Sequence, residues 1–292
     1  MDTGGALPGP RAIPIGALRL AERRARLAFT REVSPTLGAC ELTHLDRRPI
    51  DVARARRQHE AYEVTLARLG CEVHRLPPLP ELPDAVFVED TAVVLDELAV
   101  VARPGALSRR AEVPSSAAAL AEVRTLVHLD EPATLDGGDV LRLGRDIWVG
   151  RSNRTNGEAV GTLWRLLAPL GYTVTAVDVR GCLHLKSAVT AIADGSVLVN
   201  PEWVDSATFT GLDVIEVDPR EPHGANALRL GSTLVYPSAF PLTRRRLEAR
   251  GLDVVTVDVS ELAKAEGAVT CCSLIVEGGA EAPPRPDPTT EE

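Results

Sequence analysis

A hairpin pattern repeats along this chain of 292 residues and limits the folds that it can adopt. Each repeat has a short apolar strand, a turn of Asp, Gly or Ser, and a second apolar strand, which is typical of β-hairpins. The hairpins are predicted at 91–105, 140–152, 188–201 and 227–241. Helical periodicity is found over 52–69, 115–127, 156–170 and 241–250, and β-like segments follow these helices. The chain therefore repeats a unit of strand, strand, helix and strand.

An incomplete fifth hairpin lies near the C-terminus, where a single strand is predicted within 273–277. The segment 26–33 can supply the missing partner strand. Pairing between the two would cover sheet edges that otherwise invite aggregation. The beginning and the end of the folded chain are therefore expected to meet in one sheet.

One polar residue capable of chemistry stands directly before the first strand of each hairpin: Asp90, Asp139, His184, Asn226 and Cys271. The intervals between them are 49, 45, 42 and 45 residues. Near-regular intervals of this length indicate a radial or stacked repeat, and in a closed ring equivalent positions converge near the axis. We therefore expect these residues to surround one central pocket. The alternative is a set of unrelated hairpins within an α/β domain.

The composition restricts the kind of partner and the compartment. The net charge of −9 argues against nucleic acid and anionic membranes as partners. No apolar run approaches the roughly 18 residues of a membrane span, and no signal peptide is recognised, so a cytoplasmic location is expected. The five cysteines are expected to be reduced, and no CxxC pair or histidine cluster indicates a metal site.

The folded part of the chain is expected to be one α/β domain over 25–277. Residues 1–24 are rich in Gly, Pro, Ala and Arg, and residues 278–292 are rich in Pro and in acidic residues. Segments of this kind bury too little apolar surface to offset the entropy lost on folding. Both ends are therefore expected to be disordered.

Cys271 and His184 are the first candidates for chemistry. A thiolate is a strong nucleophile when a nearby cation or polar group stabilises it, and histidine exchanges protons near neutral pH. Each also has a structural alternative, since free cysteines are often small core residues and many histidines are surface or hydrogen-bonded core groups. Because side chains alternate along a strand, Cys272 should face away from any pocket that Cys271 lines.

Acidic residues gather in the loops before the first two hairpins: Asp84, Glu89 and Asp90 in one loop, and Asp136 and Asp139 in the other. Carboxylates pair well with a planar guanidinium, and one carboxylate of the second loop could orient a histidine. Solvated loop acids and a plain turn are the alternatives. Arg109 and Arg154 follow hairpins, where an arginine can hold a carboxylate through two hydrogen bonds.

Six motifs occur in an order that resembles the dimethylarginine dimethylaminohydrolases, a family of guanidino-group-modifying enzymes. They are LPDAVFVEDTAVV (82–94), RPGALSRR (103–110), LDGGDV (135–140), SNRTN (152–156), LHLKS (183–187) and VTCCS (269–273). The resemblance extends from about residue 26 to residue 277. It implies a five-bladed α/β propeller, or pentein, that is built from pseudo-symmetric ββαβ modules and forms a single catalytic domain.

The resemblance also implies a reacting centre. Cys271 corresponds to the nucleophile, His184 to the general acid/base, and Asp136 to the carboxylate that orients the histidine. Asp90, with Glu89 beside it, corresponds to the acid that binds the guanidinium. Neither a metal nor an organic cofactor is implied.

Five further positions correspond to family contacts with the rest of the substrate. Asp84 and the backbone of Leu37 match contacts to an α-amino group. Arg109 and Arg154 match a clamp for an α-carboxylate. The backbone of Ala265 matches a position that lines the pocket.

The implied activity is hydrolysis of an Nω-methylated arginine to citrulline and an amine. Arginine deiminases of the same superfamily typically carry His-x-Asp, whereas Lys186 stands at the third position here and leaves room for methyl groups. Alternatives are hydrolysis of arginine or another guanidino compound, transfer to an amine acceptor, and a non-catalytic propeller that binds a macromolecule. The expected partner is a small cationic amino acid, and the expected state is a monomer or a homodimer. Glu266 stands where the family often has Asp, so no role is transferred to it.

Overall fold

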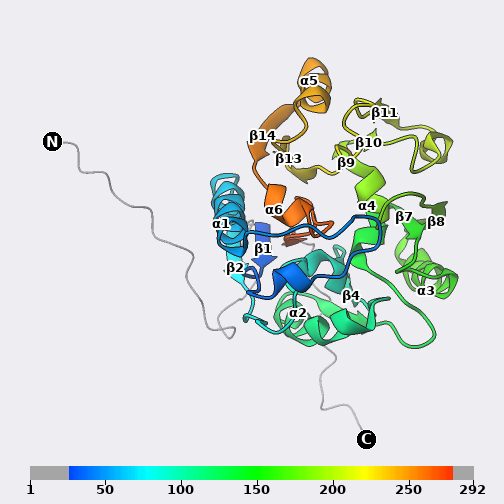
Figure 1. The fold of residues 1–292 in the computed structure, drawn as a ribbon. Helices are drawn as coiled ribbons and strands as arrows, with labels where there is room; N and C mark the ends of the chain where they lie inside the picture. Colours follow the sequence, from blue (N-terminus) through cyan, green and yellow to red (C-terminus); the bar gives the residue numbers. More distant parts are fainter. Residues whose placement is uncertain (1–25, 279–292) are drawn as a thin grey trace, which may run out of the picture.

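Five small three-stranded sheets with helices between them make up residues 26–278, which are the residues that the computed structural model describes (Figure 1). The strands are β1 (Arg26–Thr30), β2 (Cys71–Arg75), β3 (Ala92–Val94), β4 (Leu98–Val101), β5 (Thr125–His128), β6 (Val140–Leu143), β7 (Asp146–Arg151), β8 (Thr173–Asp178), β9 (Val189–Ala193), β10 (Ser196–Val199), β11 (Asp213–Glu216), β12 (Leu228–Leu230), β13 (Thr233–Pro237), β14 (Asp253–Val257) and β15 (Leu274–Val276). The sheet orders are β15-β1-β2, β3-β4-β5, β6-β7-β8, β11-β10-β9 and β12-β13-β14. In every sheet the middle strand pairs antiparallel with one neighbour and parallel with the other.

The two ends of the described chain meet in one sheet, which confirms the prediction from the incomplete fifth hairpin. β1 pairs antiparallel with β15, with Leu27 opposite Val276, and parallel with β2, with Leu27 opposite Glu72. An ion pair of 2.8 Å between Arg26 and Glu277 lies at the same edge. The last strand therefore completes the sheet that the first strand begins.

Most helices lie where the periodicity predicts them. The helices are α1 (Val52–Arg68), α2 (Val113–Ala121), α3 (Gly157–Leu167), α4 (Leu185–Ala188), α5 (Pro241–Ala249) and α6 (Ser260–Ala263), with short 3₁₀ turns η3 (Leu37–Ala39), η4 (Val88–Thr91), η5 (Leu107–Glu112), η6 (Gly137–Asp139), η7 (Ala168–Leu170) and η8 (Ser206–Phe209). The prediction of a helix over 115–127 is wrong in its second half, because α2 ends at Ala121 and the β-branched segment from Thr125 joins β4 as β5. Between β10 and β11 the described chain has the turn η8 in place of an α-helix.

Helix α3 shows how a helix covers a sheet. Its side chains Ala159, Leu163 and Leu167 recur every four residues and are fully buried. They belong to one apolar cluster with Ile147 and Val149 of β7. Burial of a leucine side chain contributes roughly 1.5–3 kcal/mol, so this stripe is sufficient to hold the helix against the sheet.

Neighbouring sheets contact each other through their first strands: β15 with β3, β6 with β9, and β9 with β12. Two arginines at equivalent positions also join neighbouring sheets. Arg142 of β6 binds Asp96 in the preceding sheet at 2.6 Å, and Arg229 of β12 binds Asp194 in the preceding sheet at 2.7 Å. The same interaction thus recurs two units apart, so the repeat extends from strand order to individual side chains.

The expected disorder of both ends concerns residues that, apart from Gly278, lie outside the described part of the chain. Within residues 26–278, every helix is too short or too polar to cross a bilayer.

Candidate functional site

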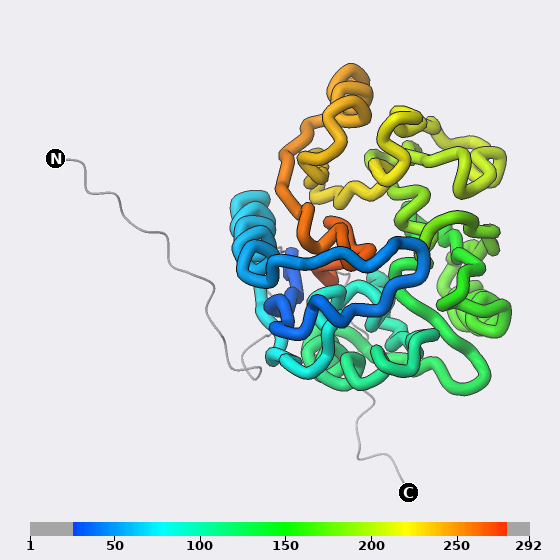
Figure 2. Tube along the Cα trace, in the orientation of Figure 1, coloured from blue at the N-terminus to red at the C-terminus, as the bar shows by residue number. Residues whose placement is uncertain are grey.

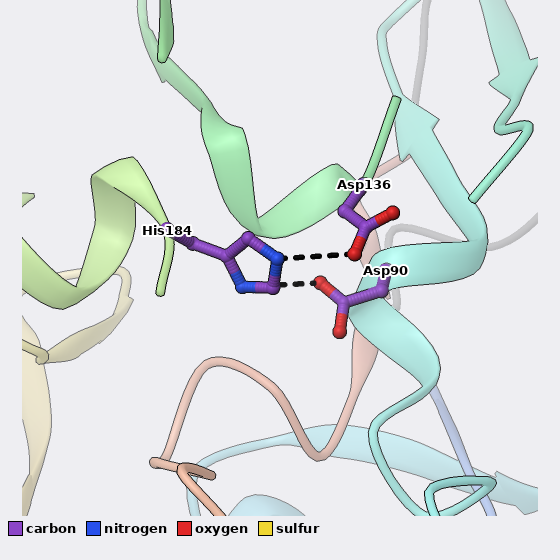
Figure 3. Close-up of side chains that lie close together, drawn as sticks. All are labelled: Asp90, Asp136 and His184. Carbon is purple, nitrogen blue, oxygen red and sulfur yellow. Dashed lines mark hydrogen bonds and ion pairs between the residues drawn. The ribbon is translucent and has the colours of Figure 1, made fainter. Parts of the chain in front are cut away.

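Short helical turns bring the predicted polar residues together. Asp90 lies in η4, Asp136 directly precedes η6, and His184 directly precedes α4. η6 contacts both η4 and α4. The sequence places Asp90 and His184 immediately before strands, whereas in the structure Asp90 lies within the turn η4 and the helical turn α4 separates His184 from β9. At the second equivalent position, Asp139 ends η6 directly before β6, as predicted. Figure 3 shows the three side chains pointing toward one another from three different segments.

One edge of the His184 imidazole faces two buried carboxylates (Figure 3). Its Nε2 atom is 3.1 Å from Oδ2 of Asp136, and its Nδ1 atom is 3.8 Å from Oδ1 of Asp90. The backbone N–H of Gly138 donates to Asp90 at 3.0 Å. A Cβ atom at Gly138 would lie 2.7 Å from Nδ1 of the histidine, so glycine is required for this close approach.

Nearby charges outweigh burial in setting the protonation of this cluster. Burial alone would lower the pKa of His184, but the carboxylates of Asp90 and Asp136 raise it to about 9. Burial would also raise the pKa of Asp90, whereas His184 and the Arg109 guanidinium hold it below its ordinary value. At neutral pH the cluster therefore contains a protonated imidazole beside an ionised Asp90.

Cys271 lies half-buried in the turn that leads into β15, and its carbonyl accepts a hydrogen bond of 3.1 Å from the Glu89 N–H. Burial, together with the charges of Glu89 and Asp90, raises the pKa of its thiol to about 12. The thiol is therefore protonated at neutral pH in the free protein. Cys272 is fully buried and donates to the Ala268 carbonyl at 3.4 Å, so the two neighbouring cysteines face different environments, as strand alternation predicts.

One small pocket contains most of the predicted site. Its lining residues are Glu41, Asp84, Phe87, Asp90, Arg109, Arg154, Leu183, His184, Ala265, Glu266, Gly267 and Cys271. Seven of the ten predicted site residues are in this set. The spacing argument and the family resemblance therefore converge on one place in the structure.

Two of the three remaining predicted residues lie just behind the pocket. Asp136 is fully buried and reaches the site through its hydrogen bond to His184. Leu37 is fully buried in η3, within the apolar cluster against which Cys271 packs. Its carbonyl, the backbone group that can accept from an α-amino group, already accepts from the Cys40 N–H at 3.0 Å.

Glu89 is the third predicted site residue that does not line the pocket, and both of its carboxylate oxygens accept hydrogen bonds. Lys186 Nζ donates to one oxygen at 2.6 Å, and Thr270 Oγ1 donates to the other at 2.7 Å. The three residues also line a second cavity, and none of them lines the pocket that holds Cys271. Glu89 thus fixes the segment just before Cys271 as well as bringing negative charge near the thiol.

Arg109 is buried, and each nitrogen of its guanidinium binds a protein acceptor. Its guanidinium forms an ion pair with Asp90, donates to Glu112 at 2.8 and 3.1 Å, and donates to the Phe87 carbonyl at 3.0 Å. Truncating a residue with so many buried charged partners is strongly destabilising in general. Arg109 therefore holds the loop that carries Asp90, whatever contact it makes with a ligand.

A loop over 40–50 crosses the face of the molecule beside this pocket, and Figure 2 shows it in blue in front of the orange segment near residue 265. Two pocket residues hold the loop. The Glu41 N–H donates to the Asp84 carboxylate at 3.0 Å, and Arg154 donates to Thr43 Oγ1 at 3.3 Å. The loop therefore forms one wall of the site.

Glu266 anchors this loop, although no role was predicted for it. Its carboxylate accepts hydrogen bonds from three consecutive backbone N–H groups, those of Thr43 (2.8 Å), His44 (2.6 Å) and Leu45 (2.9 Å). It is also the one non-glycine residue with a positive φ among residues 26–278, at 58°. A side chain that keeps this disfavoured backbone conformation is held there by its partners.

Replacing Glu266 with glycine should open the loop without straining the turn. Glycine adopts positive φ freely, so Glu266→Gly relieves the backbone while it removes the carboxylate. We expect trypsin to cleave the exposed Arg47–Arg48 bond at least several-fold faster than in the parent protein, with little change in melting temperature. Glu248→Ala, which removes an exposed ion pair on α5, is the control. An unchanged cleavage rate in Glu266→Gly would show that the three hydrogen bonds do not hold the loop.

Asp90, Asp136 and His184 are also the residues that could hold a metal ion, since their ligand atoms lie within 4.8 Å of one another. The short distances among these three side chains are also explained without a metal, by their hydrogen bonds and ion pairs with one another and by the ion pair of Asp90 with Arg109. The absence of a metal in the reaction stays a prediction.

Known proteins resemble this chain over most of its length, although no family model matches it. N(G),N(G)-dimethylarginine dimethylaminohydrolase from Streptomyces coelicolor is 40% identical over 257 residues, which cover 86% of this chain and 96% of the relative. The protein of the same name from Pseudomonas aeruginosa is 31% identical over 226 residues and is covered to 89%.

Solved structures agree with these relatives. A cysteine-to-serine variant of the Pseudomonas aeruginosa enzyme, complexed with citrulline, superimposes with a TM-score of 0.81 at 28% identity, over 87% of this chain and all of the other. A dimethylarginine dimethylaminohydrolase adduct with S-methyl-L-thiocitrulline gives a TM-score of 0.80 at 29% identity, over 86% of this chain and all of the other. The N-terminal domain of the arginine dihydrolase ArgZ shares the mixed α/β fold, with a TM-score of 0.77 at 19% identity.

The fold, the pocket cysteine beside a histidine–carboxylate pair and these similarities place the chain in the class of hydrolases. Within that class, the chain belongs to the dimethylarginine dimethylaminohydrolase family.

Proposed function

We propose that this protein hydrolyses asymmetric dimethylarginine or monomethylarginine to L-citrulline and dimethylamine or methylamine. The observation that carries the proposal is the pocket shared by Cys271, Asp90 and His184, with Asp136 hydrogen-bonded to the histidine. The names of the relatives support this substrate, and citrulline and S-methyl-L-thiocitrulline are present in the two similar structures.

Binding of the substrate activates the nucleophile in this proposal. The guanidinium pairs with Asp90 and places a positive charge beside Cys271. Burial and two carboxylates raise the pKa of this thiol to about 12 in the free protein. A bound cation offsets the negative charge, lowers the pKa and favours the thiolate when the reacting carbon is in place.

The thiolate then attacks the central carbon of the guanidinium. Protonated His184 donates its proton to the departing methylated nitrogen, the C–N bond breaks, and a covalent thiouronium remains on Cys271. The neutral imidazole next takes a proton from a water molecule whose oxygen attacks the same carbon. The C–S bond breaks, the added hydroxyl loses its proton to solvent, where the released amine takes up a proton, citrulline leaves, and the thiolate is restored. Asp136 keeps the imidazole in position through both proton transfers.

The other end of the substrate meets the remaining predicted residues. Asp84 binds the α-amino group, and Arg154 and Arg109 bind the α-carboxylate. Arg154 is the more available of the two arginines, because the nitrogens of Arg109 already bind protein acceptors. The backbones of Leu37 and Ala265 complete this end of the site.

We also infer that the five sheets form a five-bladed propeller and that one catalytic domain covers 25–277. The contacts between first strands, the sheet completed by β15 and β1, and the convergence of equivalent residues support the ring. A cytoplasmic location and a monomeric or homodimeric state remain predictions.

Product analysis separates this proposal from hydrolysis of arginine. Arginine, monomethylarginine and asymmetric dimethylarginine would be assayed side by side for citrulline, ammonia, methylamine and dimethylamine. We expect kcat/KM to be about tenfold or more higher for a methylated substrate, since recognition of one methyl group is worth roughly 1–3 kcal/mol. Ammonia released from arginine at comparable efficiency would favour a deiminase.

A thiol-reactive guanidine analogue addresses the non-catalytic alternative. The proposed enzyme should be labelled selectively at Cys271, and mass mapping can distinguish this residue from the other four cysteines. A binding module has no reason to show that selectivity.

A further inference from the structure

Asn226 stands at one of the five equivalent positions of the repeat, yet neither the sequence nor the proposed mechanism gives it a role. It lies just before β12, and its side chain is buried. Its carboxamide makes three hydrogen bonds. Nδ2 donates to the Lys186 carbonyl at 3.0 Å and to Thr270 Oγ1 at 2.9 Å, and Oδ1 accepts from the Thr270 N–H at 3.1 Å.

These bonds join two segments that carry reacting groups. Lys186 follows His184 by two residues, and Thr270 directly precedes Cys271. The two segments are 40 and 44 residues away from Asn226 along the chain. A single side chain thus links the backbone beside the acid/base to the backbone beside the nucleophile.

The donor and acceptor pattern allows one orientation of the amide. The Thr270 N–H can donate and cannot accept, so it requires the oxygen of Asn226. The Thr270 hydroxyl has one proton, which it donates to Glu89 at 2.7 Å, and it therefore accepts from Asn226 Nδ2. Asparagine supplies this combination of two donors and one acceptor, whereas aspartate of the same size supplies no donor.

We propose that Asn226 is a positioning residue for the hydrolysis, because its amide sets the position of Cys271 relative to His184. The proposal rests on the proposed function for the identity of the reaction. Displacement of a reacting group by about 1 Å can cost 10²-fold in rate. Loss of the three bonds loosens the segment before Cys271, which is then held by its bonds to Glu89, while the residues that bind the substrate keep their contacts.

The first test compares Asn226→Ala with a matched asparagine. Asn200 is equally buried, and its carboxamide donates to the Pro222 carbonyl at 2.8 Å and accepts from the Glu202 N–H at 2.9 Å. Neither partner lines the pocket. We expect Asn226→Ala to lower kcat with asymmetric dimethylarginine about 10–100-fold with KM changed less than about threefold. Asn200→Ala should leave both constants near those of the parent, although its melting temperature falls.

Asn226→Asp is the second variant, because it keeps the volume and the acceptor for Thr270 and removes both donors. We expect its kcat to fall as well. Parent-like kcat in folded Asn226→Asp, or an equal loss of kcat in Asn200→Ala, would overturn the proposal. If Asn226→Ala does not fold, the aspartate variant alone decides.

The last measurement needs no substrate. The rate at which iodoacetamide labels Cys271 is followed against pH in the full chain. Burial and nearby carboxylates raise the pKa of this thiol, so a loosened segment should let water in and move the labelling midpoint toward the ordinary thiol value in Asn226→Ala. An unchanged midpoint would overturn the proposal. A shifted midpoint in a protein that hydrolyses no methylarginine would leave the positioning role standing and reject the proposed function.

Discussion

Cys271→Ser should abolish release of citrulline while folding and substrate binding stay largely intact. A serine hydroxyl is close in size to the thiol, and the side chain is half-buried, so the fold has little to lose. The chemistry loses its nucleophile, because charge near a bound guanidinium can favour a thiolate but cannot ionise an alcohol at neutral pH. The measurement is citrulline formation from asymmetric dimethylarginine, with ligand binding followed by calorimetry.

Cys272→Ser is the matched control. This neighbouring thiol is fully buried and bonds to the Ala268 carbonyl. A hydroxyl there should lower stability by about 1–3 kcal/mol, as burial of a poorly paired polar group generally does. Turnover by the folded fraction should remain. Turnover in Cys271→Ser, or its complete loss in folded Cys272→Ser, would contradict the assignment of the nucleophile.

Asp136→Asn should lower kcat by roughly 10³–10⁴-fold, the scale seen when the carboxylate that orients a catalytic histidine is replaced by an amide. The variant keeps the shape of the site and removes the charge that faces His184 Nε2 at 3.1 Å. Since Asp90 and Asp136 raise the pKa of the imidazole, the alkaline limb of the kcat profile should also move to lower pH. Steady-state kinetics between pH 6 and 10 measure both effects.

Asp139→Asn, in the same loop, is the comparison. Its carboxylate accepts from the Leu185 N–H at 2.9 Å and from Ser152 Oγ at 2.6 Å, and an asparagine oxygen can keep the backbone bond. The loss of kcat should therefore be much smaller than in Asp136→Asn. Equal losses of kcat in the two variants would mean that kcat depends on the conformation of this loop and not on the charge beside His184.

Local patterns in the sequence were sufficient to predict much of this architecture. Turn residues and apolar alternation located the hairpins, and the unpaired strand at 273–277 correctly predicted its pairing with the N-terminal strand. Near-regular spacing of five polar residues before the hairpins predicted one shared pocket. Asp90, His184 and Cys271 line that pocket, whereas Asp139 and Asn226 do not. These successes depend on periodicity, which a single sequence displays directly.

The missed features depend on side chains that meet across the chain. Glu266 binds the backbone of residues about 220 positions earlier, and no pattern near Glu266 indicates it. The ion pairs of Arg109 with Asp90 and Glu112 could not be predicted either. The sequence around an arginine before a helix is the same whether its guanidinium binds a ligand or other protein side chains. The Lys186–Glu89 bond likewise joins two separate loops.

The loop over 40–50 mimics the amino-acid end of the proposed substrate in the free protein. The Glu41 N–H occupies the carboxylate of Asp84 as an α-ammonium would, and the Thr43 hydroxyl occupies Arg154 as an α-carboxylate would. A substrate with both groups can replace both bonds and leave the loop attached through Glu266. A simple alkylguanidine has no α-ammonium and no α-carboxylate. It can bind only around Asp90, and the bonds from Glu41 to Asp84 and from Arg154 to Thr43 stay in place. Under the proposed function, this arrangement would favour whole amino acids over free guanidines.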